Sequence, residues 1–126
     1  MPTPAPVPRP VVLLVDDEAA LLDSLRVSLE AEFDLDLASS AEEAELMMAT
    51  RTYDVVVSDH LMPGEEGLQF LIRAQQRRPA TQRILLTGYM NPELISRSVA
   101  LAGLSSCLVK PVRAADLAVA IHAALR

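Results

Sequence analysis

The sequence lacks several features that would point to particular classes of protein. It has one cysteine, which excludes an internal disulfide framework and a zinc site built on cysteines. No apolar run reaches the roughly 20 residues that span a bilayer, and the N-terminus has no cationic segment followed by an apolar core. We therefore expect a cytoplasmic protein with no signal peptide and no membrane partner.

Basic residues are also scarce relative to acidic ones. Eleven lysines and arginines against seventeen aspartates and glutamates give a formal net charge of −6. A nucleic-acid-binding domain needs a basic face, so we expect no direct contact with nucleic acid. Hydrophobic residues make up 51% of the 126 residues, as is typical of a single folded domain with its own core.

Proline is concentrated at the N-terminus, at positions 2, 4, 6, 8 and 10. Proline has no backbone N–H and a fixed φ, so this stretch cannot form a helix or a paired strand. We expect residues 1–10 to be an extended tail and residues 11–126 to form the domain. A proline-rich docking ligand is a weaker interpretation of the tail than an uncommitted leader.

Short apolar runs recur along the domain, at residues 11–15, 55–57, 84–86 and 107–109. Uniform runs of this length are typical of parallel strands that are buried on both faces. A further segment, residues 33–37, alternates apolar and acidic residues, as expected of a strand at a sheet edge.

Helical patterns separate these strands. They predict helices over 18–32, from Ser40 onward, over about 66–77, over 91–103 and over 113–125. In the fourth helix, Leu94, Ile95, Val99 and Ala102 form the expected buried stripe. A five-fold strand–helix alternation predicts an α/β fold with a doubly wound parallel sheet, in the flavodoxin-like strand order 2-1-3-4-5.

Reactive residue types stand where these strands end. They are Asp16 and Asp17, Asp59, Thr87 and Lys110. Parallel strands bring their carboxyl ends to one edge of the sheet, so we expect these side chains to meet. Clustered carboxylates repel each other, and a bound divalent cation such as Mg²⁺ removes that conflict. A nearby lysine and hydroxyl then suit a phosphoryl group.

The set resembles the receiver (CheY-like) domain of two-component response regulators over residues 11–125. The resemblance depends on five elements in order, which are Asp16-Asp17, Asp59, Met62-Pro63-Gly64 with Gly67, Thr87-Gly88 and Lys110-Pro111. It implies a phosphoacceptor in a phosphorelay rather than an enzyme, with at most self-phosphorylation from small donors and slow autodephosphorylation.

The resemblance also implies a role for each residue. Asp59 would accept the phosphoryl group from a sensor histidine kinase or a histidine phosphotransfer protein. Asp17, Asp59 and the backbone carbonyl of Leu61 would bind Mg²⁺, with Asp16 acting through water. Lys110 and Thr87 would contact phosphoryl oxygens, and the Gly88 N–H is a further candidate donor. In this family the bond that corresponds to Lys110-Pro111 is usually cis.

One position departs from the family pattern. Receiver domains usually carry an aromatic residue three positions before the lysine, and here that residue is Cys107. The usual coupling of Thr87 to an aromatic ring is therefore in question, with Tyr89 a candidate substitute. We expect the switch to act through the fourth helix, fifth strand and fifth helix, on a partner, an output domain or a second copy. Candidate residues of that surface are Asn91, Glu93, Arg97, Arg113 and Asp116.

Three other interpretations fit parts of the sequence. The alternative that we keep is a receiver-fold interaction module that works without phosphorylation, which the loss of the aromatic at Cys107 favours. A phosphohydrolase of the haloacid dehalogenase type would have aspartate where Leu61 stands. A flavin carrier would have a Ser/Thr/Gly-rich loop in place of Asp16-Asp17. We expect His60 and His122 to be structural residues rather than metal ligands.

Overall fold

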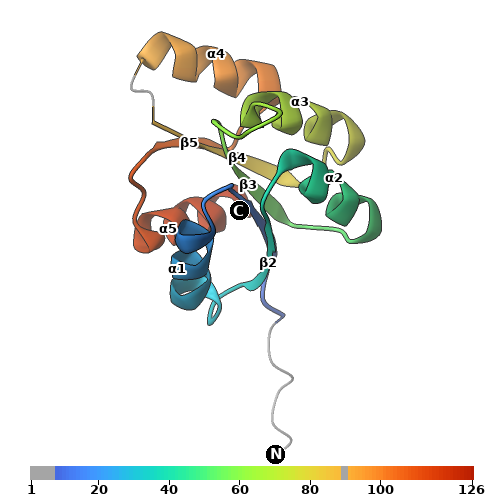
Figure 1. Ribbon diagram of the computed structural model, residues 1–126, viewed down its shortest axis with the longest axis vertical. Helices are drawn as coiled ribbons and strands as arrows, with labels where there is room; N and C mark the ends of the chain where they lie inside the picture. The colour runs from blue at the N-terminus through green and yellow to red at the C-terminus, as the bar shows by residue number, and fades with distance from the viewer. Residues whose placement is uncertain (1–7, 89–90) are drawn as a thin grey trace, which may run out of the picture.

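The computed structural model describes residues 8–88 and 91–126, in which strands and helices alternate (Figure 1). The strands are β1 (Val11–Val15), β2 (Asp34–Ala38), β3 (Val55–Asp59), β4 (Gln82–Thr87) and β5 (Ser106–Val109). The helices are α1 (Ala19–Leu29), α2 (Ala41–Thr50), α3 (Gly67–Arg77), α4 (Pro92–Ala102) and α5 (Ala114–Ala124). Tyr89 and most of the proline-rich tail lie outside the described residues.

The strands form one parallel sheet in the order β2-β1-β3-β4-β5. Helices α1 and α5 cover one face, and α2, α3 and α4 cover the other (Figure 1). The predicted α/β fold and its strand order are therefore confirmed. Every residue of β3 is buried, because this central strand has neighbours on both sides and helices above and below.

The edge strand β2 differs from the others because it is only partly buried. Its two acidic side chains bind Arg51 at the end of α2, with Nη–Oδ distances of 2.6 Å to Asp34 and 2.8 Å to Asp36. The Tyr53 hydroxyl donates a further hydrogen bond to Asp36. The alternation of apolar and acidic residues thus predicted the edge strand correctly. Its two acidic side chains both pair with Arg51.

Two helices begin at residues whose side chains cap the first turn. The Ser40 hydroxyl accepts a hydrogen bond from the Glu43 N–H at 3.1 Å, and the Asn91 side chain accepts one from the Glu93 N–H at 3.0 Å. The Glu43 carboxylate, however, binds the backbone and hydroxyl of Ser39 rather than Ser40. In a capping box, the glutamate three residues after the cap bonds back to the N–H of the capping residue itself. Here Glu43 bonds one residue earlier, to Ser39.

In the predicted buried stripe of α4, Ala102 is confirmed and Val99 is wrong. Val99 is 37% exposed, whereas Ser98 and Ala102 are buried at 4% and 0%. Successive helical residues are about 100° apart, so a helix that packs through Ser98 and Ala102 turns Val99 outward. Both inward residues are small, which allows α4 to lie close to its neighbours. The side chain of Leu94 lies outside the described part of the structure.

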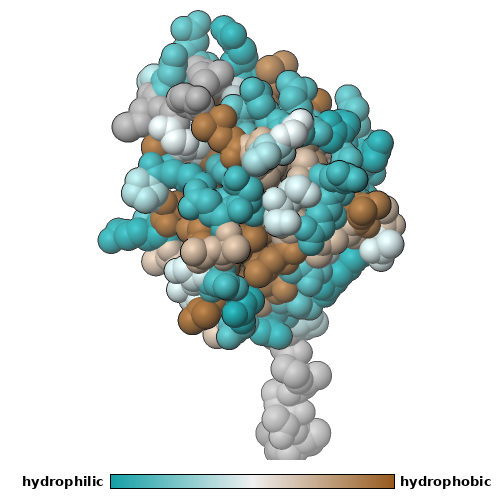
Figure 2. All heavy atoms as spheres, in the orientation of Figure 1, coloured by the Kyte–Doolittle hydropathy of each residue, from teal (hydrophilic) through white to brown (hydrophobic). Residues whose placement is uncertain are grey.

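The described surface is largely polar, with apolar side chains exposed in separate places. Figure 2 shows hydrophilic atoms over much of one face, with smaller apolar patches between them. The exposed large apolar residues are Val27, Leu46, Leu61, Val99, Leu101, Val119 and Leu125. Among residues 8–88 and 91–126, no helix is long and apolar enough to cross a membrane.

Arg83 is a buried charge at the start of β4 that no sequence pattern indicated. It is 6% exposed and donates hydrogen bonds to the carbonyl oxygens of Ala102 at 2.9 Å, Gly103 at 3.0 Å and Thr81 at 2.6 Å. Burial lowers the pKa of this guanidinium. A cation at a helix C-terminus also interacts favourably with the helix dipole. Arg83 therefore fixes the C-terminal end of α4 to β4.

We expect Arg83→Met to lower the free energy of unfolding by about 2 to 4 kcal/mol, because it leaves several buried carbonyls without donors. Urea denaturation would measure the loss. Arg97→Met is the matched control, since Arg97 lies on the exposed side of α4 and pairs only loosely with Glu93. Its effect should stay within about 0.5 kcal/mol. Equal effects of the two substitutions would contradict the anchoring role.

Candidate functional site

The register of the sheet brings the predicted site residues to one edge. Val15 of β1 pairs with Ser58 of β3, so the residues that follow, Asp16 and Asp59, lie side by side. Thr87 of β4 pairs with Val109 of β5, and the Lys110 N–H donates to the Thr87 carbonyl at 2.8 Å. Parallel strands must present their carboxyl ends together, which is why distant parts of the sequence meet here.

Lys110 lies between the two buried carboxylates of this edge. Its Nζ is 3.0 Å from Asp16 Oδ2 and 3.2 Å from Asp59 Oδ1. Asp16 and Asp59 are 2% and 5% exposed. The other Asp16 oxygen accepts a hydrogen bond from the Glu18 N–H at 2.9 Å. Asp16 thus orients the lysine and, through Glu18, the start of α1.

The electrostatics of this pocket are those of crowded carboxylates. Burial, and next the charge of Asp16, raise the pKa of Asp59, although Lys110 acts in the opposite direction. Burial alone would lower the pKa of Lys110. Its hydrogen bonds to Asp16 and Asp59, and the negative charges of these residues, outweigh burial and raise the pKa of Lys110. The lysine is therefore held in its charged form, and the ionised form of Asp59 is disfavoured.

Three carboxylates are placed to hold a cation. Oxygens of Asp16, Asp17 and Asp59 all lie within 4.8 Å of one another. Asp17 is exposed, whereas the other two are buried. Carboxylate oxygens of this kind suit a hard cation such as Mg²⁺, which binds proteins through few carboxylates and keeps several waters. The donor set therefore fits the expected metal.

Two further features of the predicted site, Thr87 and the Lys110–Pro111 bond, lie at this edge. Thr87 is 4% exposed at the end of β4. The Lys110–Pro111 peptide bond is cis, as the resemblance implied. A cavity of about 350 Å³, lined in part by Glu18, Lys110 and Pro111, opens beside the lysine. Glu18 was expected only as a helix start, although its place two residues after Asp16 was a signal for its nearness to the site.

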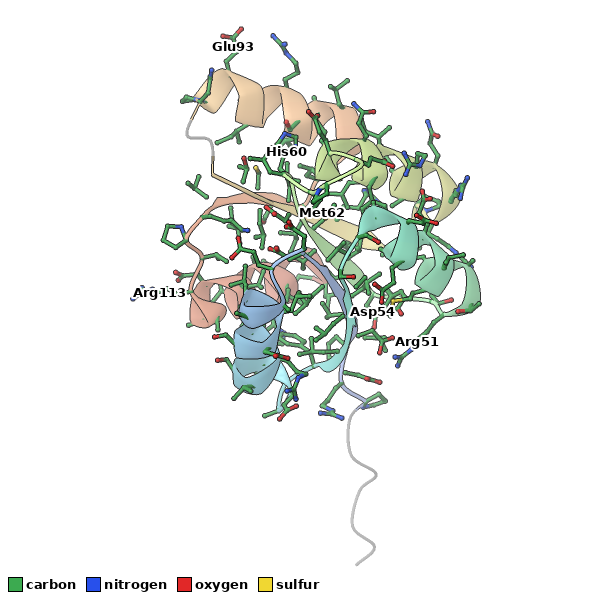
Figure 3. All side chains as sticks on the ribbon, in the orientation of Figure 1. Arg51, Asp54, His60, Met62, Glu93 and Arg113 are labelled. Carbon is green, nitrogen blue, oxygen red and sulfur yellow. The ribbon has the colours of Figure 1, made fainter. Side chains whose placement is uncertain are left out.

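The loop between β3 and α3 packs against Asp59 from the other side. The Gly67 N–H donates to the His60 carbonyl at 2.8 Å, and the Met62 side chain is buried at 8% exposure. Figure 3 shows His60 and Met62 in this loop. Leu61, whose carbonyl is a predicted ligand, has a side chain that is 54% exposed. The loop is therefore anchored by Met62 while Leu61 faces outward.

Gly67 has a steric role that the sequence did not reveal. A Cβ built on it would lie 1.9 Å from the Asp59 carbonyl oxygen and 2.9 Å from the Ser58 hydroxyl. No side chain fits that space, so α3 can begin against the end of β3 only with glycine at this position. The motif indicated that Gly67 mattered, but only the tertiary contact shows why.

The other singled-out residues lie elsewhere. His122 pairs with Glu32 at 3.0 Å and packs on Phe33, with ring centroids 4.9 Å apart, between α5 and the segment after α1. Cys107 is half-buried in β5 opposite Leu85 and packs against the core under α2 and α3. Burial raises the pKa of its thiol.

Comparison with known proteins agrees with this geometry. Residues 12–122 match the family model described as response regulator receiver domain. The chain belongs to this family. It is 38% identical over 100 residues to the hydrogenase transcriptional regulatory protein HoxA of Cupriavidus necator, covering 79% of this chain and 21% of that one. It is 35% identical over 121 residues to the phosphate regulon transcriptional regulatory protein PhoB of Rhizobium meliloti, covering 93% and 52%.

Solved receiver structures show the same fold. The signal receiver domain of an HD domain-containing protein from Pseudomonas fluorescens has a TM-score of 0.86 and 32% identity, over 99% of this chain and 93% of that one. A CheY-like receiver from Methanospirillum hungatei has a TM-score of 0.85 and 31% identity, over 93% and 94%. Receiver domains are phosphoacceptor signalling modules rather than catalytic enzymes. The chain spans about half or less of the length of the two curated relatives above.

We expect Gly67→Ala to lower the free energy of unfolding by about 2 to 3 kcal/mol, because the new methyl group must displace the Asp59 backbone or the start of α3. Gly88→Ala is the matched control, since a Cβ there meets no atom within 4 Å. Chemical denaturation of both receiver variants would measure the difference. A neutral Gly67→Ala would mean that this loop adjusts without cost.

Asp59→Asn should raise the free energy of unfolding at pH 7 when divalent cations are chelated, because it removes a carboxylate whose ionised form the pocket disfavours. The gain should shrink as the pH falls from above the raised pKa of Asp59 toward the ordinary value of about 3.9. In that pH window Asp59 of the wild-type protein takes up a proton on folding. The cost of holding an ionised carboxylate in the pocket therefore disappears from the wild type too. Denaturation curves over a pH series would check this sign.

The control for this pH series is Asp54→Asn at the other end of β3, where the Asp54 carboxylate accepts a hydrogen bond from the Val11 N–H at 2.8 Å. This substitution should not stabilise the protein at any pH. A loss of stability in Asp59→Asn throughout the series would show that attraction by Lys110 outweighs burial and repulsion at Asp59.

Proposed function

We propose that this receiver is a phosphorylation-controlled switch in which Asp59 is the phosphoacceptor. The observation that carries this proposal is the placement of Lys110 Nζ 3.2 Å from Asp59, in a pocket where three carboxylates lie within 4.8 Å of one another. Ligands gather at the carboxyl edge of a parallel sheet, and there Lys110 orients the Asp59 carboxylate for an incoming phosphoryl group.

In the proposed reaction an Asp59 carboxylate oxygen forms a bond to phosphorus while the bond from phosphorus to the donor's imidazole nitrogen breaks. The electron pair of that bond returns to the imidazole, and the product is an aspartyl phosphate. Lys110 is a point charge for one phosphoryl oxygen, and the Thr87 hydroxyl and the Gly88 N–H are donors for others. The donor is a sensor histidine kinase or a histidine phosphotransfer protein.

The proposed metal is Mg²⁺, with Asp17, Asp59 and the Leu61 carbonyl as direct ligands. When bound, it neutralises charge on the transferred phosphoryl oxygens. Asp16 acts through water in this scheme, because its own oxygens already accept hydrogen bonds from Glu18 and Lys110. The exposed position of Asp17 favours it as the ligand that an arriving ion meets first.

The proposed output surface is formed by α4, β5 and α5. Its candidate residues are all exposed: Asn91, Glu93, Arg97, Arg113 and Asp116. Figure 3 shows Glu93 on the first turn of α4 and Arg113 at the start of α5. We infer that phosphorylation shifts Thr87, with Tyr89 and Cys107 as the adjoining switch positions, and that this surface then binds a partner, an output domain or a second copy.

We further propose that residues 1–10 are a tail and residues 11–126 the receiver, which acts in the cytoplasm without contacting nucleic acid or membrane. The second candidate function is an interaction module that needs no phosphorylation. A specific observation favours it, because the half-buried Cys107 occupies the place of the family's aromatic residue. Phosphorylation with a small donor separates the two functions.

We expect acetyl phosphate with Mg²⁺ to add one phosphoryl group to the wild-type protein and none to Asp59→Asn, with a spectroscopic change in the wild type only. Lys110→Ala should reduce the rate at least tenfold, because it removes the charge next to the acceptor. Intact-mass measurement and NMR would record both effects. Asp54→Asn is the control, because Asp54 lies at the opposite end of β3 from the site and should react like the wild type (Figure 3).

Failure of the folded wild-type protein to react with either acetyl phosphate or a phosphorylated histidine donor would overturn the proposal. The interaction module would then be the better account of the chain, and Cys107 the first position to examine.

A further inference from the structure

Arg73 on α3 joins two other parts of the structure through its guanidinium group. Its Nε is 2.7 Å from Glu45 Oε1 on α2, and its Nη2 is 2.8 Å from Glu65 Oε2 in the loop after β3. Its Nη1 also contacts the second Glu65 oxygen, so both oxygens of this carboxylate lie against the guanidinium group. Hydrogen bonds to Glu65, and next to Glu45, raise the pKa of Arg73, which therefore remains charged.

The loop that Arg73 holds contains a proposed metal ligand. Residues 60–66 begin directly after Asp59 and include Leu61, whose carbonyl is the expected third ligand. The near half of the loop is fixed by the buried Met62 and by the hydrogen bond from the His60 N–H to the Leu86 carbonyl at 2.9 Å. The far half has less support.

An open cavity of about 310 Å³ lies between the far half of the loop and α2, lined by Pro63, Gly64 and Glu65 on the loop side. Gly64 has a φ of +88°, a conformation that glycine adopts freely. Pro63 and Gly64 are exposed, so apolar burial does not fix this half of the loop. Arg73 links Glu65 in this half to Glu45 on α2.

We propose that Arg73 is a positioning residue for the cation site, which it serves by holding the loop 60–66 through Glu65. The proposal rests on the proposed function, because it takes Leu61 as a ligand. A loop that is already ordered loses less conformational entropy when its carbonyl binds an ion, so the arginine raises metal affinity without touching the metal. Glu45 fixes the guanidinium from the other side and sets its direction.

Arg51 provides a control within the same chain. It too binds two carboxylates, Asp34 and Asp36, and its side chain is 38% exposed against 35% for Arg73. Its partners lie on the edge strand β2 and not in the loop. Arg51→Gln and Arg73→Gln therefore remove similar ion pairs, but only the second should affect the metal site.

The test is a Mg²⁺ titration followed by the NMR signals of the Asp59, Leu61 and Met62 amides, at a temperature where circular dichroism shows every variant to be folded. We expect Arg73→Gln and Glu65→Gln each to weaken Mg²⁺ binding by about 3- to 10-fold. The variant that carries both substitutions should bind Mg²⁺ no more weakly than either single variant, because each substitution removes the same Arg73–Glu65 pair. Arg73→Lys should recover part of the affinity, since it keeps the charge but not the planar group that reaches both Glu45 and Glu65.

Wild-type affinity in Arg73→Gln, or equal weakening in Arg51→Gln, would overturn the inference and leave the proposed function intact. Absence of Mg²⁺ binding by the wild type would overturn the proposed function and the inference with it. The second measurement is the rate of phosphorylation by acetyl phosphate. At saturating Mg²⁺, Arg73→Gln should be phosphorylated at a rate near that of the wild type.

Discussion

The repulsion between carboxylates at one edge of the sheet is the constraint on which the functional part of this structure depends. Asp16 and Asp59 are both buried, and Asp17 lies within reach of each. Lys110 offsets part of the repulsion, and a divalent cation would offset the rest. The pocket therefore attracts positive charge, which is the condition that the proposed acceptance of a phosphoryl group needs.

The surrounding fold holds the two sides of this pocket in different ways. On the side formed by the loop after β3, the loop is held at Met62, which is buried in the core, and at Gly67, which allows α3 to start against Asp59. On the other side, Arg83 fixes the C-terminal end of α4 to β4. The N-terminal end of α4 follows Thr87 within a few residues. The start of this helix, which belongs to the proposed output surface, is therefore close in sequence to Thr87.

The predictions that failed or were missing concern side chains whose role depends on a distant neighbour. Val99 fits an apolar helical stripe, but the small residue Ser98 allows closer packing and takes its place beside Ala102. Arg83 is polar, and it is buried because the end of α4 supplies carbonyl oxygens around it. Arg73 occupies an ordinary helix position, and its two partners come from other elements. None of these partners can be identified from local sequence.

The sequence by itself determined the order of elements, the central strands and the residue types at their ends, because these depend on local periodicity and on turn-forming residues. It also determined which side chains meet, since parallel strands share one carboxyl edge. Only the tertiary structure decided the 3.0 Å and 3.2 Å contacts of Lys110, the steric demand for Gly67 and the partners of Arg73 and Arg83. These depend on distances between segments far apart in the chain, which the packing of the helices on the sheet sets and no local pattern encodes.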